Sequence, residues 1–268
     1  MPAKPFQFVI ISDILFGCDK QEDGQFRLLP SRALSLLRYL INKMNTNLKP
    51  AFVIQLGNSI EPDDEETDEE NFETIVDAFK QLTVPSYHVV GDNEQVNLSQ
   101  KKLREMLKYE KLYYSFDSGD FHFVVLFASS KDHSDIHIDE AQRKWLMNDL
   151  ESTAKPCMVF VHHPIDEQDL TDNFWYEKNP EKCFVEERQE VREILARSGK
   201  VRVVFSGHVY QNNLEEHDGV RYVSIQSLVR NMSKASKTPS ESFAIVTPTA
   251  REIRVEIEGN DQIVFSIN

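Results

Sequence analysis

The sequence has few cysteines and no segment that would join two domains. Its three cysteines, Cys18, Cys157 and Cys183, are odd in number, lie far apart and form no CxxC pair. That pattern favours free thiols in a reducing compartment over a disulfide framework. No Pro-, Gly- or Ser-rich linker interrupts the 268 residues, so we expect a single domain spanning residues 1–268.

Long apolar runs and clusters of positive charge are missing too. No stretch approaches the roughly 18 consecutive apolar residues that suggest a membrane span, and the first residues, MPAKPFQFVIIS, lack the basic region and longer apolar core of a secretory signal. The formal net charge is −14, and no run of five or more Lys or Arg occurs. Because phosphate contacts need clustered cations, these features argue against nucleic acid and anionic membranes as partners. We expect a cytoplasmic protein.

Motifs of several common enzyme classes are also absent. No G-x-S-x-G, Walker loop or Rossmann glycine pattern occurs, which leaves serine hydrolases, nucleoside triphosphatases and dehydrogenases without support. What the sequence does contain is an acidic run at 61–70 (EPDDEETDEE), with eight carboxylates in ten residues. We interpret this run as a solvated loop and an acidic first helical turn. The alternative is that it binds divalent cations loosely or repels anions from a nearby site.

The order of the predicted elements indicates an α/β fold. Buried apolar runs at 6–12, 51–56 and 86–90 predict strands, and apolar residues at helical spacing predict helices at 30–44 and 69–82 between them. The second half begins with a hairpin and ends in strands only. Its predicted elements lie at 113–117, 121–128, 139–150, 157–161, 186–196, 201–206, 220–226, 242–247, 252–258 and 262–267. Mixed elements followed by antiparallel strands predict two packed sheets with helices outside.

Polar side chains follow five of the predicted buried strands. They are Asp13, Asn58, Asp92-Asn93-Glu94, His162-His163 and His208. Each alone is typical of a turn cap or a packed side chain. Five such positions in order predict convergence on one edge of the sheet, where the ligands of α/β proteins collect. Their oxygen and nitrogen donors suit Zn, Mn or Fe.

In these stretches the chain resembles the calcineurin-like metallophosphoesterases, whose motifs are D-x-H, G-D, G-N-H-[DE], a His commonly followed by x-P, and G-H-x-H. The matching stretches are Asp13-Ile14-Leu15, Gly57-Asn58, Gly91-Asp92-Asn93-Glu94, His162-His163-Pro164 and Gly207-His208-Val209-Tyr210. Within the family the sequence is most similar to the ADP-ribose/CDP-alcohol diphosphatase branch, in stretches such as FVIQLGNSIEP and FSGHVYQNN. The resemblance implies a four-layer sandwich of two mixed sheets flanked by helices, with two metal ions about 3.5–4 Å apart.

The resemblance also implies which positions would hold the first ion. They are occupied here by Asp13, Leu15, Asn58 and Tyr210. Leu15 cannot ligate a metal, and the neutral Asn58 and Tyr210 are poor donors. Only Asp13 remains as a good ligand, so we expect this site to be empty and a dinuclear centre to be absent.

The second ion would use a better set of side chains. By the resemblance these are Asn58, Asp92, His162 and His208. The family has Asp at the position of Asn58 and Asn at the position of Asp92, so the two residue types have exchanged places and the shell keeps one negative charge. Two imidazoles, a carboxylate and an amide form a reasonable shell for one Zn, Mn or Fe ion.

The family's catalytic His is also replaced, by Asn93. An amide donates a hydrogen bond but cannot act as a general acid, and losing such a group typically costs about 10²–10⁴-fold in rate. His163 is the possible substitute, as ligand or proton donor, although we expect it to face the opposite side of its strand end. The other histidines have no motif context, and surface or packing roles are expected for His88, His122, His133, His137 and His217.

Two functional hypotheses follow from these substitutions. The first is a weakly active or non-catalytic relative, in effect a pseudoenzyme, that works by binding a protein partner or a small phosphorylated ligand. The alternative is a mononuclear metal-dependent hydrolase of phosphodiester or pyrophosphate substrates of nucleotide type.

Overall fold

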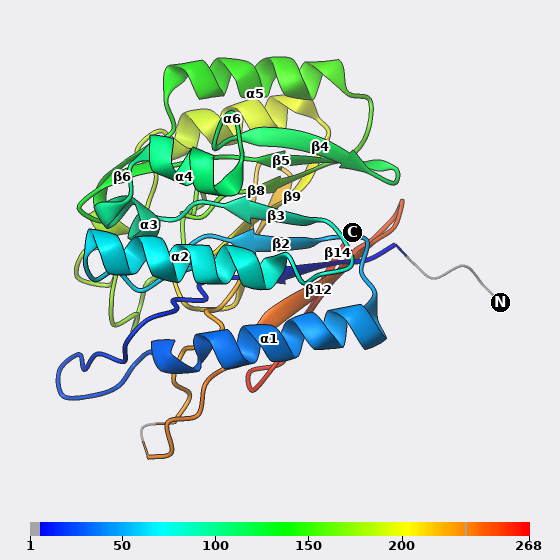
Figure 1. Cartoon of the computed structure of the whole chain (residues 1–268). Helices are drawn as coiled ribbons and strands as arrows, with labels where there is room; N and C mark the ends of the chain where they lie inside the picture. The colour runs from blue at the N-terminus through cyan, green and yellow to red at the C-terminus, as the bar shows by residue number, and fades with distance from the viewer. Residues whose placement is uncertain (1–5, 234) are drawn as a thin grey trace.

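Two six-stranded mixed sheets form the centre of the computed structural model, which describes residues 6–233 and 235–268 (Figure 1). The first sheet has the order β14-β13-β12-β1-β2-β3 and the second β10-β11-β9-β8-β5-β4. The strands of the first are β1 (Phe8–Ile11), β2 (Val53–Leu56), β3 (Ser86–Val89), β12 (Phe243–Pro248), β13 (Ile253–Glu258) and β14 (Ile263–Ile267). Those of the second are β4 (Tyr114–Ser118), β5 (Phe121–Val125), β8 (Cys157–Phe160), β9 (Val201–Ser206), β10 (Asn213–His217) and β11 (Val220–Ser224).

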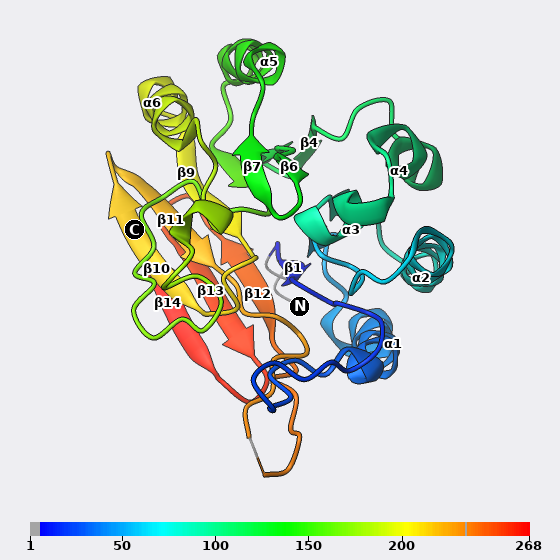
Figure 2. The ribbon, with the colours of Figure 1, turned by 90° about the vertical axis from the view of Figure 1, so that its left-hand side faces the viewer.

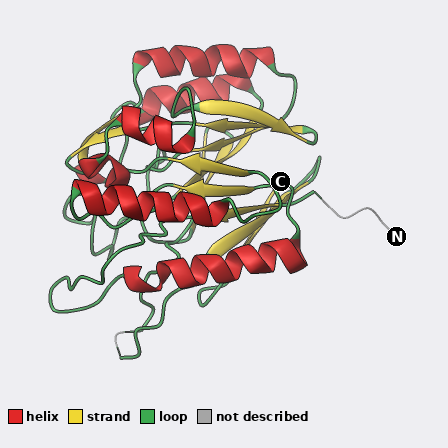
Figure 3. Ribbon diagram, viewed as in Figure 1, coloured by secondary structure: helices red, strands yellow, loops and turns green. Residues whose placement is uncertain are grey.

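Helices cover the outer face of each sheet, as Figure 3 shows in red against yellow strands. Apolar residues of α1 and α2 pack on the first sheet, and those of α5 and α6 pack on the second. The longer helices are α1 (Ala33–Lys43), α2 (Glu65–Phe79), α3 (Asp92–Asn97), α4 (Gln100–Leu107), α5 (Glu140–Ser152) and α6 (Arg188–Ser198). Shorter helical turns are η1 (Pro30–Arg32), η2 (Met44–Leu48) and η3 (Pro180–Lys182). The predicted four-layer sandwich is confirmed.

The alternation of side chains along β1 explains how one strand serves two apolar layers. Phe8 and Ile10 belong to the core between the sheets, whereas Val9 and Ile11 belong to the core under α1 and α2. All four are fully buried, and a strand that is buried on both faces reads as an uninterrupted apolar run. In the central layer the Phe8 ring stacks on Phe52 at a centroid distance of 4.8 Å.

Several details differ from the sequence-based expectation. The short helices α3 and α4 were not predicted. Helix α2 begins at Glu65 rather than at 69, because the Asp64 side chain caps it by accepting from the Thr67 amide and acidic residues fill its first turn. Residues 64–70 of the acidic run therefore form the cap and first turns of α2, as its interpretation predicted, but Asp68 is buried rather than solvated. The polar strands β6 (Ser129–Lys131), β7 (Ser134–His137) and β10 were not predicted, since they lack an apolar alternation.

The strand directions bring the motif loops together. Strands β1, β2 and β3 run parallel to one another, as do β8 and β9 in the other sheet. Loop hydrogen bonds join their carboxyl ends: the Asp13 amide donates to the Gly57 carbonyl and the Gly207 amide donates to the His162 carbonyl. Figure 2 views the sandwich from this end. Within residues 6–233 and 235–268, no helix has the length and apolar character needed to cross a membrane.

Candidate metal centre

Four buried side chains converge where the two sheets meet. Asp92 is the first residue of α3, His162 and His163 follow β8, and His208 follows β9. One potential ligand atom from each of these residues lies within 4.8 Å of those of the other three. We call Asp92, His162, His163 and His208 the four-ligand cluster.

The ring orientations of His162 and His208 are set by backbone carbonyls. Nδ1 of His162 lies 2.9 Å from the Leu56 carbonyl oxygen, and Nε2 of His208 lies 2.9 Å from that of Lys182, so these nitrogens carry the hydrogens. The remaining nitrogens then face each other at 3.2 Å, and Oδ1 of Asp92 lies 3.2 Å from the first and 3.4 Å from the second. Three lone pairs at such short range repel unless a proton or a metal ion lies among them. This donor set fits a divalent cation.

His163 belongs to the same cluster, and the expectation that it faces the opposite side of the strand end is wrong. Its Nε2 lies 3.8 Å from Oδ1 of Asp92, and its ring centroid is 4.4 Å from that of His208. Neither ring nitrogen has a hydrogen-bond partner among the described residues, although the side chain is fully buried. A buried polar group without a partner is costly, and coordination of a metal ion by one of these nitrogens would reduce that cost.

The pKa values of the cluster residues indicate that a proton and a metal ion compete for the same place among them. Burial alone would raise the pKa of Asp92, but the imidazoles of His208, His133 and His162 outweigh it and hold that pKa well below its usual range. Burial would lower the pKa of His162, but its hydrogen bond to Asp92 and the charge of Asp13 raise it to about 9. Burial and the neighbouring His208 lower the pKa of His163.

The positions predicted for the other ion look quite different, and we call them the depleted positions: Asp13, Leu15, Asn58 and Tyr210. Leu15 is fully buried in the apolar layer under α1, and Tyr210 packs edge-on against Trp175 at a centroid distance of 4.7 Å. Oδ2 of Asp13 accepts hydrogen bonds from the Ser12 hydroxyl and the His208 amide, whereas Oδ1 has no partner in the described chain. Burial raises the pKa of Asp13.

Asn58 and Asn93 are tied to each other and to the backbone. Oδ1 of Asn58 accepts from the Asn93 amide at 3.0 Å, and the Asn93 side chain donates to the Ile60 carbonyl at 2.9 Å. Glu94 accepts hydrogen bonds from the amides of Ser59 and Gly91, which makes it a structural cap of α3. The roles of Asn58 as a ligand and of Asn93 at the catalytic position stay predictions.

The backbone of the motif loops has an unusual conformation at both kinds of position. Non-glycine residues in the left-handed region are Asp13 (φ 48°), Leu15 (54°), Asn58 (52°), His208 (66°) and Tyr210 (54°). Such conformations cost about 1–3 kcal/mol each and cluster at functional sites. Gly57 is required for close approach, because a Cβ there would lie 2.3 Å from Nδ1 of His162. Left-handed backbone thus occurs at His208 of the cluster and at all four depleted positions.

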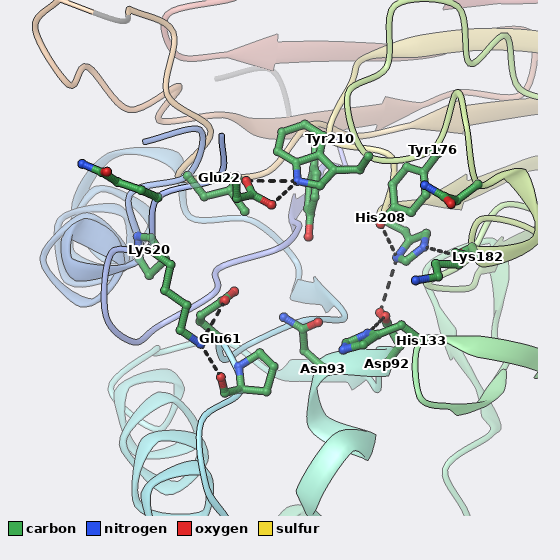
Figure 4. Close-up of a pocket in the computed structure, with 16 residues that line it drawn as sticks. Lys20, Glu22, Glu61, Asp92, Asn93, His133, Tyr176, Lys182, His208 and Tyr210 are labelled. Carbon is green, nitrogen blue, oxygen red and sulfur yellow. Dashed lines mark hydrogen bonds and ion pairs between the residues drawn. The ribbon is translucent and has the colours of Figure 1, made fainter. Parts of the chain in front are cut away.

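A pocket of about 490 Å³ opens onto the cluster (Figure 4). Figure 4 places Lys20 and Glu61 on one side of it, His208 and Lys182 on the other, and Asn93 between them. Lys20 is paired with Glu61 at 3.4 Å, whereas Lys182 makes no ion pair within the described residues. The pocket therefore offers an ammonium group beside the cluster.

His133 is the lining residue that the sequence did not reveal. A surface or packing role was expected for it, but its Nδ1 lies 2.5 Å from Oδ2 of Asp92, and its ring lines the pocket with Asn93. It comes from the turn between β6 and β7, two strands without an apolar pattern, so no sequence signal could have placed it at the site.

Comparison with known proteins agrees with the fold and the motif positions. The family model of the calcineurin-like phosphoesterases matches residues 6–212. A 3',5'-cyclic-nucleotide phosphodiesterase of Nostoc sp. is 22% identical over 171 residues, which are 63% of this chain and 60% of that protein. Purple acid phosphatase 23 of Arabidopsis thaliana is 35% identical over 106 residues, 37% of this chain and 20% of that protein. The aligned regions thus span less than two thirds of either relative.

A solved structure has the same fold over the full length. The crystal structure of a dimetal phosphatase from Danio rerio superposes with a TM-score of 0.78 and covers 99% of each chain, at 17% identity. That level of identity speaks for the fold alone. Nothing in these comparisons tests the resemblance to the ADP-ribose/CDP-alcohol diphosphatase branch, which stays a prediction.

Proposed function

The chain belongs to the calcineurin-like phosphoesterase family, and we propose that it binds one divalent metal ion and a small phosphorylated ligand with little or no hydrolysis. The observation that supports this proposal is the asymmetry between the four-ligand cluster and the depleted positions. Two-metal catalysis needs ligands on both sides of the transferred phosphoryl group. Here one side carries converging donors, and the other side carries Leu15 in an apolar core and a single unpaired carboxylate oxygen on Asp13.

The residues that would hold the ion are Asp92, His162, His163 and His208. Bound there, a divalent ion supplies a Lewis acid that attracts a phosphoryl oxygen. The protein's own contribution is to fix the donors: the carbonyls of Leu56 and Lys182 orient two of the imidazoles, and all four side chains are buried.

Groups around the pocket support an anionic ligand. Lys182 and His133 line it on the side of the cluster, and Asp92 raises the pKa of His133 through their hydrogen bond, although burial opposes the shift. Asn93 has one amide hydrogen left for a ligand, since the other goes to the Ile60 carbonyl. Glu22 and Glu61 on the far wall would repel further negative charge. A compact phosphate group facing the cluster fits this distribution better than an extended polyanion.

Two measurements test the proposal together. The protein is loaded with one equivalent of Mn²⁺ or Zn²⁺, orthophosphate binding is followed by calorimetry, and hydrolysis of bis(p-nitrophenyl) phosphate is assayed in parallel. We expect metal-dependent phosphate binding that weakens in Lys182→Met and not in Lys178→Met, an exposed lysine outside the pocket. A turnover number in the ordinary enzyme range of about 1–10³ per second would contradict the proposal.

A second candidate, a mononuclear hydrolase, is favoured by one observation. The imidazole of His133 lines the same pocket as Asn93 and adjoins Asp92, so a proton donor is available although the family's catalytic His is missing. If this candidate holds, the metal-loaded protein hydrolyses the diester, and His133→Gln removes the activity while one ion stays bound.

A further inference from the structure

A second pocket, of about 410 Å³, shares the Trp175–Tyr210 wall with the first. It lies between the loop at 17–29 and the loop around 227–242, which Figures 1 and 2 show side by side, in blue and orange. A bridge pairs Leu28 with Arg230, and the Asn231 amide donates to the Arg27 carbonyl at 2.8 Å. Two segments about 200 positions apart are thereby fixed, and each contributes one arginine to the lining.

Among the residues that the structure describes, neither arginine lies within ion-pair distance of a carboxylate. The Arg27 guanidinium stacks 3.4 Å from the centroid of the Phe174 ring, and its buried Nε has no hydrogen-bond partner among the described residues. Arg230 uses one terminal nitrogen for the Tyr210 carbonyl and the Gln226 side chain. The nitrogens that remain on both guanidinium groups are available to a ligand.

The nearby carboxylates are held by other donors. The Glu22 carboxylate interacts electrostatically with Arg27 but lies outside ion-pair distance. It accepts a hydrogen bond from Nε1 of Trp175 at 3.0 Å. Asp261 accepts from Gln226 at 2.9 Å and is likewise unpaired with Arg230. Asp172 also lines the pocket, exposed at its rim. In a chain with 44 acidic and 30 basic residues, two partly buried guanidinium groups without a carboxylate are unexpected, because partly desolvated charges are costly without a partner.

The remaining lining mixes polar side chains, such as Gln25, Asn173 and Gln211, with aromatic and apolar ones. Phe26, Phe174, Trp175 and Met232 contribute to it, and two of them, Phe174 and Met232, are each 39% exposed. Covering such partly exposed apolar side chains with an apolar group removes apolar surface from water, which lowers the free energy. The volume lies in the ordinary range for small-molecule pockets, about 300–1,000 Å³.

We propose that this second pocket binds a small organic anion, in which a carboxylate or phosphate group pairs with Arg27 and Arg230 and an aromatic or apolar group covers Phe174 and Met232. The planar guanidinium fork suits both kinds of anion. This binding is independent of the metal centre, since none of the four-ligand cluster lines the second pocket.

Fluorescence tests the proposal directly, because the chain has two tryptophans and Trp175 lines the pocket. With Trp145→Phe, Trp175 is the single reporter. The variant also carries His208→Ala and is kept in EDTA, so the metal centre cannot bind the probes. Benzoate and phenyl phosphate are titrated separately, with orthophosphate as the probe that lacks an apolar group. The same titration in Trp145→Phe with the native His208, also in EDTA, covers the case in which His208→Ala fails to fold.

We expect saturable quenching by benzoate, phenyl phosphate or both, and the stronger of the two identifies the anionic group. Arg27→Gln and Arg230→Lys should each weaken binding by about tenfold or more, the loss expected for charge-assisted hydrogen bonds. Arg251→Gln, an exposed arginine outside the pocket, should change nothing. Absence of saturable quenching in the folded protein, equal binding of orthophosphate, or binding that survives Arg27→Gln would each overturn the proposal.

Discussion

The four-ligand cluster and the depleted positions occupy the same end of the sandwich, on loops of the same kind, yet they differ in almost every chemical respect. In the cluster, potential ligand atoms of Asp92, His162 and His208 face one another at 3.2–3.4 Å. At the depleted positions, Leu15 packs in a core and Asn58 bonds to a backbone amide. The left-handed backbone nevertheless persists in both. The same backbone conformation thus occurs beside converging ligand atoms and beside side chains that mostly cannot ligate a metal.

Restoring the family's residues at the depleted positions and at Asn93 should have the largest effect on metal binding and activity. The variant carries Leu15→His, Asn58→Asp, Asn93→His and Tyr210→His. Since the backbone keeps its conformation there, we expect a second bound ion and a gain of about 10²–10⁴-fold in hydrolysis of bis(p-nitrophenyl) phosphate. The same four changes combined with His208→Ala provide the control. A folded variant that gains neither metal nor activity would show that these four side chains alone cannot rebuild a second metal site on the loops.

Changing one side chain at each kind of position should affect metal binding differently. His208→Ala deletes a donor of the four-ligand cluster and should weaken metal binding by about 100-fold or more, beyond the loss caused by mutating an outer-shell residue. Tyr210→Phe, two residues further along the same loop, should leave the affinity unchanged. Competition against a chromophoric chelator measures both. Equal losses in the two variants would contradict the division of the site.

Stability separates the two kinds of position in a different way. Leu15→Ala removes a fully buried side chain and should lower the free energy of unfolding by about 2–5 kcal/mol in urea denaturation. In metal-free protein, His163→Leu replaces a buried imidazole without a hydrogen-bond partner, so its unfolding free energy should stay level or rise. If His163→Leu destabilised the metal-free protein as strongly as Leu15→Ala, His163 would be a packing residue.

The pH dependence of metal binding tests whether the metal-free cluster holds a proton on His162. In metal-free protein the pKa of His162 is raised to about 9, so below that pH a metal ion must displace a proton. Asp92 stays ionised there because its pKa is held low. The apparent affinity for Mn²⁺ should therefore fall by about tenfold for each pH unit below 9. Chelator competition between pH 7 and 8.5 measures this slope, and a flat profile would mean that the cluster carries no such proton.

Much of the fold and the motif positions could be predicted from the sequence, because both depend on local patterns. Apolar runs such as that of β1 mark strands buried on both faces. Asp92, His162 and His208 follow the strands β3, β8 and β9 within three residues. The start of α2 was missed because a side-chain cap, Asp64, decides it.

The rest of the site depends on contacts between distant segments. His133 reaches Asp92 across 41 positions from a hairpin with a polar sequence, and the direction of the His163 ring is set by packing against His162 and His208. The pocket of Arg27 and Arg230 requires the pairing of two loops from opposite ends of the chain. Composition and periodicity carry no information on such pairings.

The number of metal ions per chain shows most directly whether the four-ligand cluster binds metal and the depleted positions do not. The protein is expressed in medium supplemented with Zn²⁺ and Mn²⁺, purified without chelator, and analysed by elemental analysis beside His208→Ala. We predict about one ion per chain in the native protein, as a single Zn²⁺-type shell requires, and a metal content at background in the variant. Two ions per chain would contradict the account, because the depleted positions would then bind metal, and so would a native protein with no more metal than His208→Ala.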